Sequence, residues 1–286
     1  MNQKNTLLMN GERNPLVSIY IPTYNRIDLL KRAINSVLSQ SYSNIELIVV
    51  DDGSTDGTVD YLSKLSEDDE RVNFIKKTGS RGAPSSRNIA IFNASGKYIT
   101  GLDDDDYLEP GYIEKLYSEY DYRYSCVFAR RFNWKDCFFS PVVFFSRVLS
   151  FDSLVFFNII GNQVFTETSR MKEIGGFKVG LEAAQDYEAW LRLLNRFGSA
   201  KMIYYSGYNV DTSHELGRIS DDRRRAIATY NYISEQYGFE KKSKEAISMN
   251  LRCYAISSEG RFPWKACFYP KNYRHLFSVL RKKLSY

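Results

Sequence analysis

The sequence contains little cysteine and no cysteine motif. Its 286 residues include four cysteines, and no two of them stand close together or at the spacing of metal ligands: Cys126, Cys137, Cys253 and Cys267. This pattern excludes a disulfide-stapled scaffold and a cysteine-ligated zinc site. The polar first 14 residues contain no recognisable signal peptide. We therefore expect reduced thiols and a cytoplasmic protein.

Long hydrophobic runs are also missing. The most apolar region, 138–160, is interrupted by Pro141, Arg147 and Asp152. No run therefore approaches the roughly 20 apolar residues that a membrane-spanning helix needs. We expect this aromatic-rich region to pack in the core or to dock helices, and a lipid-facing surface is the alternative.

Neither sign of charge dominates the chain. The formal net charge is +5, and basic residues concentrate towards the C-terminal end. That bias favours contact with an anionic membrane surface or an anionic substrate. No nucleic-acid-binding module is visible, so we expect no nucleic-acid partner. With 43% apolar and 26% charged residues, the chain has the composition of a globular protein with one large or two small domains.

Hydrophobic runs that alternate with helical periodicity predict an α/β fold. Apolar runs rich in β-branched residues predict strands at 17–22, 45–50, 72–75 and 97–102. Apolar residues at helical spacing predict helices that begin near Ile27, near Val59 and at Ala83. This alternation is typical of a doubly wound, mostly parallel sheet flanked by helices. Farther along, we expect strands at 125–132, 162–166 and 201–205, and helices from Gln185 and from Asp221.

Polar clusters follow three of these strands, at 22–25, 51–52 and 103–106. In a parallel sheet the carboxyl ends of the strands lie at one edge, where ligands bind, so the clusters predict a site. The four consecutive carboxylates of 103–106 repel one another and favour a bound cation. Asp103 and Asp105 would point the same way on an extended backbone. A hard divalent cation such as Mg²⁺ takes one or two carboxylates and completes its shell with water and phosphates. A solvated acidic turn is the alternative.

The turns after the first two strands also have simpler interpretations. Asn25 is the expected cap of the first helix. The stretch 52–57 could be a tight turn with a helix cap at Asp56. It also partly fits a calcium loop of the EF-hand type, but Ser63 stands where such a loop needs a bidentate glutamate. The calcium reading therefore fails.

Five motifs in order resemble those of the family-2 inverting glycosyltransferases, which have the GT-A fold: Pro22–Asn25, Asp51–Asp56, Arg87–Asn88, Leu102–Asp106 and Gln185–Arg192. The resemblance covers about Pro15 to Ser220. It implies a GT-A domain over 15–220 with a Rossmann-like, mostly parallel sheet. A flexible N-terminal tail over 1–14 and a helical, basic C-terminal extension over 221–286 would complete the chain.

The resemblance implies a nucleotide-sugar site at the first strand ends. Pro22, Tyr24 and Asn25 would border the nucleotide, with Pro22 and Tyr24 at the uracil pocket. Asp52 would accept a hydrogen bond from the base, which selects uracil over cytosine because the corresponding cytosine nitrogen carries no proton. Arg87 resembles the arginine that approaches the donor phosphates, and an exposed helical arginine is the alternative.

The Asp103-X-Asp105 pair resembles the family's metal motif, with Mg²⁺ or Mn²⁺ as the cofactor. Asp105 is the implied direct ligand, Asp103 lies nearer the ribose or the metal-bound waters, and Asp104 joins the nucleotide-sugar site. A loop such as 211–220 can fold over the donor diphosphate in this family. His214 and Arg218 are its candidate contacts, and a solvent-exposed loop is the alternative.

Asp186 aligns with the family's general base. Members often carry a Glu-Asp pair at this point, but Gln185 replaces the first carboxylate here, so Asp186 would act alone. The dipole at a helix start favours the charged form of an aspartate. An aspartate that only caps the helix is the alternative.

The resemblance thus implies an inverting hexosyl- or N-acetylhexosaminyltransferase that uses a UDP-sugar. The acceptor would be a saccharide, and a lipid-diphosphate-linked glycan of O-antigen or capsule is the expected one. Its basic, aromatic C-terminal region would allow peripheral contact with the inner membrane face. A sugar nucleotidyltransferase would need a glycine-rich loop after the first strand, and 22–26 contains no glycine. A non-catalytic nucleotide-sugar-binding protein is the other alternative.

Overall fold

The computed structural model describes residues 14–78, 82–130, 147–154, 158–211 and 223–237. The chain divides into two compact units. Unit 1 takes in the chain up to Ser118, together with Phe165–Gly176 and Tyr208–Val210. Unit 2 takes in Glu119–Val164, Phe177–Gly207 and the chain from Asp211 onward.

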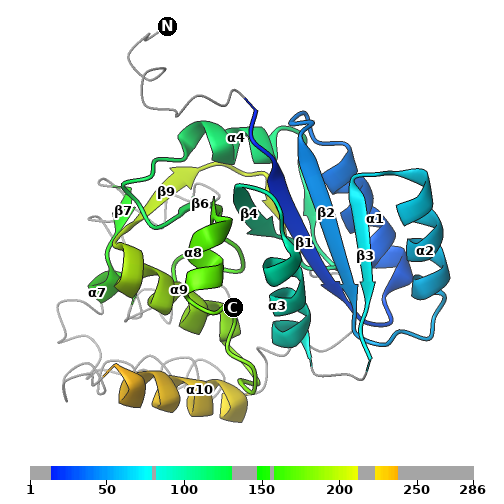
Figure 1. Ribbon diagram of the computed structural model, residues 1–286. Coiled ribbons are helices and arrows are strands. Elements are labelled where there is room, and N and C mark those ends of the chain that lie inside the picture. The colour runs from blue at the N-terminus through cyan, green and yellow to red at the C-terminus, as the bar shows by residue number, and fades with distance from the viewer. Residues whose placement is uncertain (1–13, 79–81, 131–146, 155–157, 212–222, 238–286) are drawn as a thin grey trace, which may run out of the picture. The chain divides into compact units, whose positions relative to one another are not determined.

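A five-stranded sheet forms the centre of unit 1 (Figure 1). Its spatial order is β3 (Val72–Lys76), β2 (Ile45–Asp51), β1 (Val17–Thr23), β4 (Tyr98–Gly101) and β8 (Thr166–Glu167). The first four strands are parallel, and β8 pairs antiparallel with β4. Every residue of β1 is buried, as expected for a parallel strand covered on both faces. The predicted mostly parallel α/β sheet is therefore confirmed.

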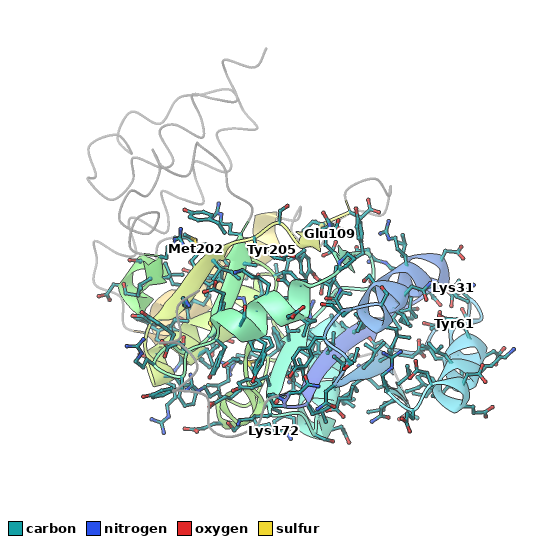
Figure 2. The ribbon with its side chains drawn as sticks, turned by 90° about the horizontal axis from the view of Figure 1, so that it is seen from above. Lys31, Tyr61, Glu109, Lys172, Met202 and Tyr205 are labelled. Carbon is teal, nitrogen blue, oxygen red and sulfur yellow. The ribbon has the colours of Figure 1, made fainter. Side chains whose placement is uncertain are left out.

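Helices cover this sheet, and they begin close to the predicted positions. α1 (Ile27–Leu38), α2 (Thr58–Asp68) and α3 (Ala83–Asn93) connect the parallel strands. α1 buries Leu30, Ala33, Ile34 and Val37, a spacing that puts one apolar stripe against the core. At the surface Lys31 of α1 lies 5.4 Å from the ring centre of Tyr61 of α2 (Figure 2). The remaining elements of unit 1 are β5 (Tyr107–Leu108), β10 (Tyr208–Asn209), α8 (Thr168–Glu173) and most of α4 (Tyr112–Glu119).

Unit 2 contains a three-stranded sheet in the order β6 (Val127–Arg130), β9 (Ala200–Tyr204) and β7 (Val148–Leu149). Its helices are α7 (Phe151–Leu154), α9 (Gln185–Phe197) and α10 (Arg223–Gln236). α9 is the most buried of them, and Trp190 on it is fully buried, edge-to-face with Phe177 at 5.6 Å. This aromatic contact packs the middle of α9 against Phe177.

Some predicted elements differ from the observed ones. Of the strand predicted at 162–166 only Thr166 belongs to β8, which continues to Glu167 and ends where α8 begins at Thr168. The strand predicted at 201–205 is β9, and a further strand that was not predicted, β10, follows it and pairs with β5. α10 shows that the chain after Asp221 is helical over 223–236, while 238–286 lies outside the described residues.

Two expectations from composition can be checked on part of the chain. Cys126 is a free, buried thiol, and the other three cysteines lie outside the described residues. The apolar region 138–160 is described only in part, and there Leu149, Leu154, Ile159 and Ile160 are buried. The described part of this region therefore packs in the core. Within the described ranges, no helix has the length and apolar composition to cross a membrane.

Candidate active site

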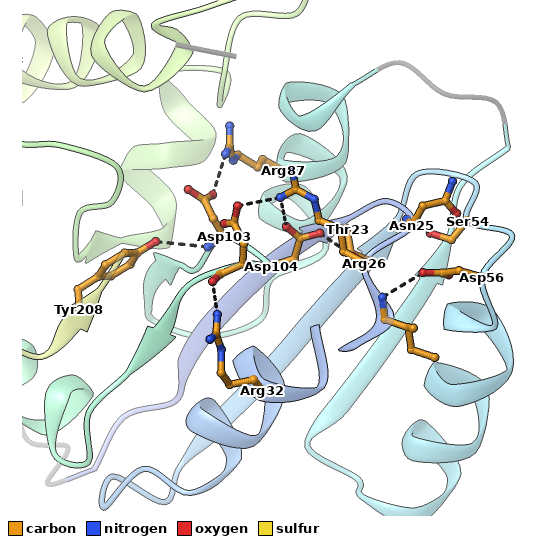
Figure 3. Close-up of polar contacts among 12 residues, drawn as sticks. Thr23, Asn25, Arg26, Arg32, Ser54, Asp56, Arg87, Asp103, Asp104 and Tyr208 are labelled. Atoms are coloured by element: carbon orange, nitrogen blue, oxygen red, sulfur yellow. Dashed lines mark hydrogen bonds and ion pairs between the residues drawn. The ribbon is translucent and has the colours of Figure 1, made fainter. Parts of the chain in front are cut away.

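The loops that follow β1 and β2 are joined by side-chain hydrogen bonds (Figure 3). Asn25 has φ 51°, and its Oδ1 accepts from the backbone N–H of Thr55 at 2.7 Å. The backbone N–H of Asn25 donates to Oγ of Ser54 at 2.8 Å. The prediction that Asn25 caps α1 is wrong, because the N-cap is Arg26 and Asn25 instead ties the two loops together.

Asp56 fixes the starts of two helices. Its Oδ2 accepts from the backbone N–H of Ile27, the first residue of α1, at 3.0 Å. Its Oδ1 accepts from the hydroxyl of Thr58, the first residue of α2, at 2.6 Å. Asp56 is not the N-cap residue of α2, which is Gly57, but its carboxylate accepts hydrogen bonds from the first residues of both α1 and α2.

The side chains of Asp51 and Asp52, at the end of β2, bond to different partners. The buried Asp51 carboxylate accepts from the backbone N–H groups of Gly53 and Ser54 at 3.1 Å, which closes the turn. Asp52 forms an ion pair with Lys77 and accepts from the backbone N–H of Gly82 at 3.0 Å. The Asp52 and Lys77 side chains are only 8% and 5% exposed.

The acidic run forms a turn and does not continue β4 as an extended strand. The backbone N–H of Asp106 donates to the backbone oxygen of Asp103 at 3.1 Å. The prediction that Asp103 and Asp105 share one side of an extended backbone is therefore wrong. The turn lets neighbouring carboxylates reach partners on different elements of unit 1.

Arginines hold the carboxylates of Asp103, Asp104 and Asp105 (Figure 3). Arg87 of α3 donates to Oδ1 of Asp103 at 2.8 Å. Nη1 of Arg26 lies 3.1 Å from Oδ1 of Asp104 and 2.8 Å from Oδ2 of Asp105. The resemblance pointed to Arg87, but the role of Arg26 was missed. Its position directly after the polar cluster 22–25 is the signal that could have revealed it.

The environment of Asp104 opposes its charged form. Burial raises the pKa of this carboxyl to about 6, against the favourable charge of Arg26 and a hydrogen bond from Thr23. The charges of Asp105 and Asp103 raise it further. The positive charge of Arg26 thus favours the charged form of Asp104 against the effect of burial.

Tyr208 of β10 contacts the same turn at the backbone of Asp103 (Figure 3). Its hydroxyl accepts from the backbone N–H of Asp103 at 3.4 Å. Burial, followed by the charges of Asp103 and Asp106, raises the pKa of Tyr208 well above its ordinary value. The phenol is therefore neutral, and it supports the backbone of the acidic turn.

Eight of the predicted site residues belong to unit 1 and lie at or next to the carboxyl ends of β1, β2 and β4: Pro22, Tyr24, Asn25, Asp52, Arg87, Asp103, Asp104 and Asp105. Pro22 is buried within β1, whereas the Tyr24 ring beyond the strand is 51% exposed. The parallel register, with Thr23 opposite Asp51, brings these strand ends together. His214 and Arg218 lie outside the described residues.

Asp186 belongs to unit 2, where it is the second residue of α9. The N-cap of this helix is Ala184, with φ 51° and no side-chain hydrogen bond to cap it. Asp186 is therefore not the N-cap residue. Its Oδ2 accepts a hydrogen bond from the side-chain amide of Asn158 at 2.8 Å, across 28 residues of sequence.

The donor set of the acidic turn suits a hard divalent cation. Asp103 and Asp105 supply carboxylate oxygens, the ligands that Mg²⁺ and Mn²⁺ prefer. In the part of the chain that the structure describes, no group of three or more His, Cys, Asp or Glu residues could hold a metal ion. Two carboxylates would therefore need phosphate and water oxygens to complete the coordination, as is usual for Mg²⁺.

Comparisons with known proteins agree with this geometry. The model of the family described as Glycosyl transferase family 2 matches residues 18–166. WcaA of Escherichia coli (strain K12), provisionally assigned as a colanic acid biosynthesis glycosyl transferase, is 33% identical over 257 residues, 86% of this chain and 87% of that protein. Chondroitin synthase of Pasteurella multocida (strain Pm70) is 30% identical over 96% of this chain, which spans only 31% of that larger protein.

Solved structures show the same GT-A fold. A mannosyltransferase of Pyrobaculum calidifontis, in complex with GDP-Man and Mn²⁺, superposes with a TM-score of 0.63 at 18% identity, covering 95% of this chain and 87% of that one. Residues 1–349 of TarS from S. aureus, in complex with UDP-GlcNAc, superpose with a TM-score of 0.58 at 15% identity, covering 94% and 91%. At these identities the likeness concerns the fold alone.

Proposed function

Because this chain belongs to glycosyl transferase family 2, we propose that it is an inverting glycosyltransferase of bacterial polysaccharide biosynthesis that transfers a sugar from a UDP-sugar to a saccharide acceptor. The observation that carries the proposal is the meeting of three parallel strand ends in unit 1. These ends place the exposed Tyr24 ring, the Asp52 carboxylate and the arginine-held acidic turn at one sheet edge.

The first two strand ends bind the nucleotide in this proposal. Tyr24 offers an exposed aromatic face on which a base can stack. Asp52, ion-paired with Lys77, is held as a carboxylate that accepts hydrogen bonds. Such an acceptor matches the N3–H of uracil and mismatches the unprotonated N3 of cytosine. Asn25 supports the donor site by fixing the loop that carries Tyr24.

In this proposal the acidic turn would hold the metal ion that accompanies the donor diphosphate. Asp105 would be the direct ligand, Asp103 would contact the ribose or metal-bound waters, and Asp104 would belong to the nucleotide-sugar site. Bound Mg²⁺ or Mn²⁺ would act as a Lewis acid that stabilises the charge on the departing diphosphate. Arg87, which pairs with Asp103, is proposed to donate to the phosphates, and His214 and Arg218 are proposed to close over them.

Asp186 is the proposed general base. The oxygen of the acceptor hydroxyl forms a bond to the anomeric carbon while the bond from that carbon to the diphosphate oxygen breaks. The hydroxyl proton passes to the Asp186 carboxylate, and UDP leaves on the opposite face. Attack from the opposite face inverts the anomeric configuration. General-base catalysis of this kind contributes about 10²–10⁴-fold to the rate.

The acceptor we propose is a lipid-diphosphate-linked saccharide on the cytoplasmic face of the membrane, as in O-antigen or capsule assembly. Support comes from the relationship to WcaA and from the basic, aromatic sequence of 261–286. Such a segment favours binding to an anionic membrane surface. The proposal keeps the domain layout of a tail over 1–14, a GT-A domain over 15–220 and an extension over 221–286. The transferred sugar is a hexose or an N-acetylhexosamine.

A binding and transfer experiment tests this function. Calorimetry with UDP and Mn²⁺ should show binding that EDTA abolishes, and mass detection should find transfer from one member of a UDP-sugar panel to a lipid-diphosphate-linked saccharide. Absence of UDP binding, together with absence of transfer from every donor, would contradict the proposal. UDP binding without any transfer would favour the non-catalytic nucleotide-sugar-binding protein.

A further inference from the structure

The loop 158–161 contacts α9 at two points that are one helical turn apart. The side-chain amide of Asn158 donates to Oδ2 of Asp186 at 2.8 Å. The indole N–H of Trp190 donates to the backbone oxygen of Gly161 at 2.9 Å. Residues i and i+4 lie on the same face of a helix, so Asp186 and Trp190 both face this loop. Because Trp190 is fully buried, the second contact anchors the loop to the core of unit 2.

The orientation of the Asn158 amide follows from a second hydrogen bond. Its Oδ1 accepts from the backbone N–H of Gly161 at 3.2 Å. Only the oxygen of an amide can accept a hydrogen bond, so the NH₂ group is the one that faces Asp186. Gly161 has φ +85°, a backbone conformation that glycine adopts without strain. The turn therefore sets the direction in which Asn158 donates.

We propose that Asn158 is the positioning residue for Asp186 in the transfer reaction, an inference that rests on the proposed role of Asp186 as general base. A general base must keep an oxygen within hydrogen-bond reach of the attacking hydroxyl. By holding Oδ2, Asn158 fixes the plane of the carboxylate and thus the direction of the lone pairs on both oxygens. Because the amide is neutral, it orients the carboxylate without the charge of a lysine or arginine, which would weaken the base.

Substitutions of Asn158 can separate this role from a contribution to loop stability. Asn158→Asp has nearly the same shape and keeps an oxygen for the N–H of Gly161. It replaces the donor that faces Asp186 by a second carboxylate oxygen. A role confined to the 158–161 turn would therefore survive Asn158→Asp, whereas positioning of Asp186 would not. Asn158→Ser retains a hydroxyl that can donate, and it is the conservative variant.

The test uses the full chain with Mn²⁺ and measures UDP release from the best donor among UDP-glucose, UDP-galactose, UDP-N-acetylglucosamine and UDP-glucuronate. Asn158→Asp should lower kcat by about 10²-fold, the usual effect of a misplaced reacting group, with unchanged affinity for UDP in calorimetry. Asn158→Ser should recover part of kcat. A crystal structure of Asn158→Asp should show a changed Asp186 rotamer.

Two outcomes would overturn the inference. Wild-type kcat in Asn158→Asp, while Asp186→Asn is inactive, would leave Asp186 as the base and remove Asn158 from the mechanism. An unchanged Asp186 rotamer in the Asn158→Asp crystal structure would also show that Asn158 does not position Asp186, whatever the activity. Full activity of Asp186→Asn is a different result, since it would contradict the proposed base itself.

Discussion

At the scale of single residues, the candidate site is a set of carboxylates held by cationic side chains. Arg87 holds Asp103, Arg26 holds Asp104 and Asp105, and Lys77 holds Asp52. Removing one member of a buried pair is costly because the other is left as an uncompensated charge in a region of low polarity. The pair Lys77 and Asp52 is the most buried of the three sets, so it allows the clearest test.

Lys77→Met should lower the free energy of unfolding by about 3–5 kcal/mol, because Asp52 then keeps a buried charge without a counter-ion. Adding Asp52→Asn should restore a large part of this loss. Urea denaturation measures both. Lys76→Met is the matched control, since Lys76 is the exposed neighbour on β3 and its change should have little effect. Equal effects of Lys76→Met and Lys77→Met would contradict the buried ion pair.

Two adjacent glycines allow a second test at this scale. Gly175 and Gly176 both have positive φ, so alanine at either position costs about 1–2 kcal/mol of backbone strain. A Cβ on Gly175 would meet open space, whereas a Cβ on Gly176 would lie 2.3 Å from Oδ1 of Asn88. Gly176→Ala should therefore be less stable than Gly175→Ala by about 1–3 kcal/mol in urea denaturation. Equal stabilities would show that Asn88 moves aside freely.

At the scale of helices and strands, Asp56 couples two helices of the sheet edge. It accepts from the first residue of α1 and from the first residue of α2, so one carboxylate orders both helix starts. The loops that carry Tyr24 and Asp52 lie between these elements. Loss of Asp56 should therefore loosen the proposed nucleotide site as well as the helices.

Asp56→Ala should lower the free energy of unfolding by about 1–2 kcal/mol, because it removes hydrogen bonds to the first residues of α1 and α2, each worth about 0.5–1.5 kcal/mol. Asp60→Ala provides the control, because Asp60 is exposed in the first turn of α2 and contributes only through the helix dipole, about 0.3–1 kcal/mol. Thermal or urea unfolding measures the loss of stability in Asp56→Ala and in Asp60→Ala. A smaller effect at Asp56 than at Asp60 would show that the hydrogen bonds to Ile27 and Thr58 are dispensable.

The sequence predicted the elements of unit 1 far better than the contacts within the site. Hydrophobic periodicity is a local property, so α3 and the starts of β1 and β2 were found at their observed residues. The cationic partners of the carboxylates were not predicted, because they are distant in sequence. Arg26 and Asp104 are 78 residues apart, and Lys77 and Asp52 are 25 residues apart. The turn at 103–106 was also missed, because an apolar run that ends in carboxylates does not show where the backbone stops being extended.

At the scale of the whole molecule, the predicted residues divide between the two units. Unit 1 carries the proposed nucleotide and metal residues, and unit 2 carries Asp186 with its partner Asn158. The proposed function therefore assigns the metal and most nucleotide contacts to residues of unit 1 and proton removal to a residue of unit 2. Changes at Asp186 or Asn158 should affect the chemical step and leave nucleotide affinity intact.

Metal removal tests whether the acidic turn acts in the reaction through a bound metal ion. EDTA should abolish UDP release from the active donor, and added Mn²⁺ should restore it, because the diphosphate charge is otherwise unscreened beside four carboxylates. Full activity in EDTA would contradict the metal-binding role of Asp103 and Asp105.

The most direct measurement compares Asp105→Asn with Asp186→Asn, using UDP affinity by calorimetry with Mn²⁺ and UDP release from the active donor. We expect Asp105→Asn to lose both. We expect Asp186→Asn to bind UDP as the wild-type protein does, while UDP release falls by about 10²–10⁴-fold. Undiminished UDP release by Asp186→Asn, or wild-type UDP affinity in Asp105→Asn with Mn²⁺, would contradict the account.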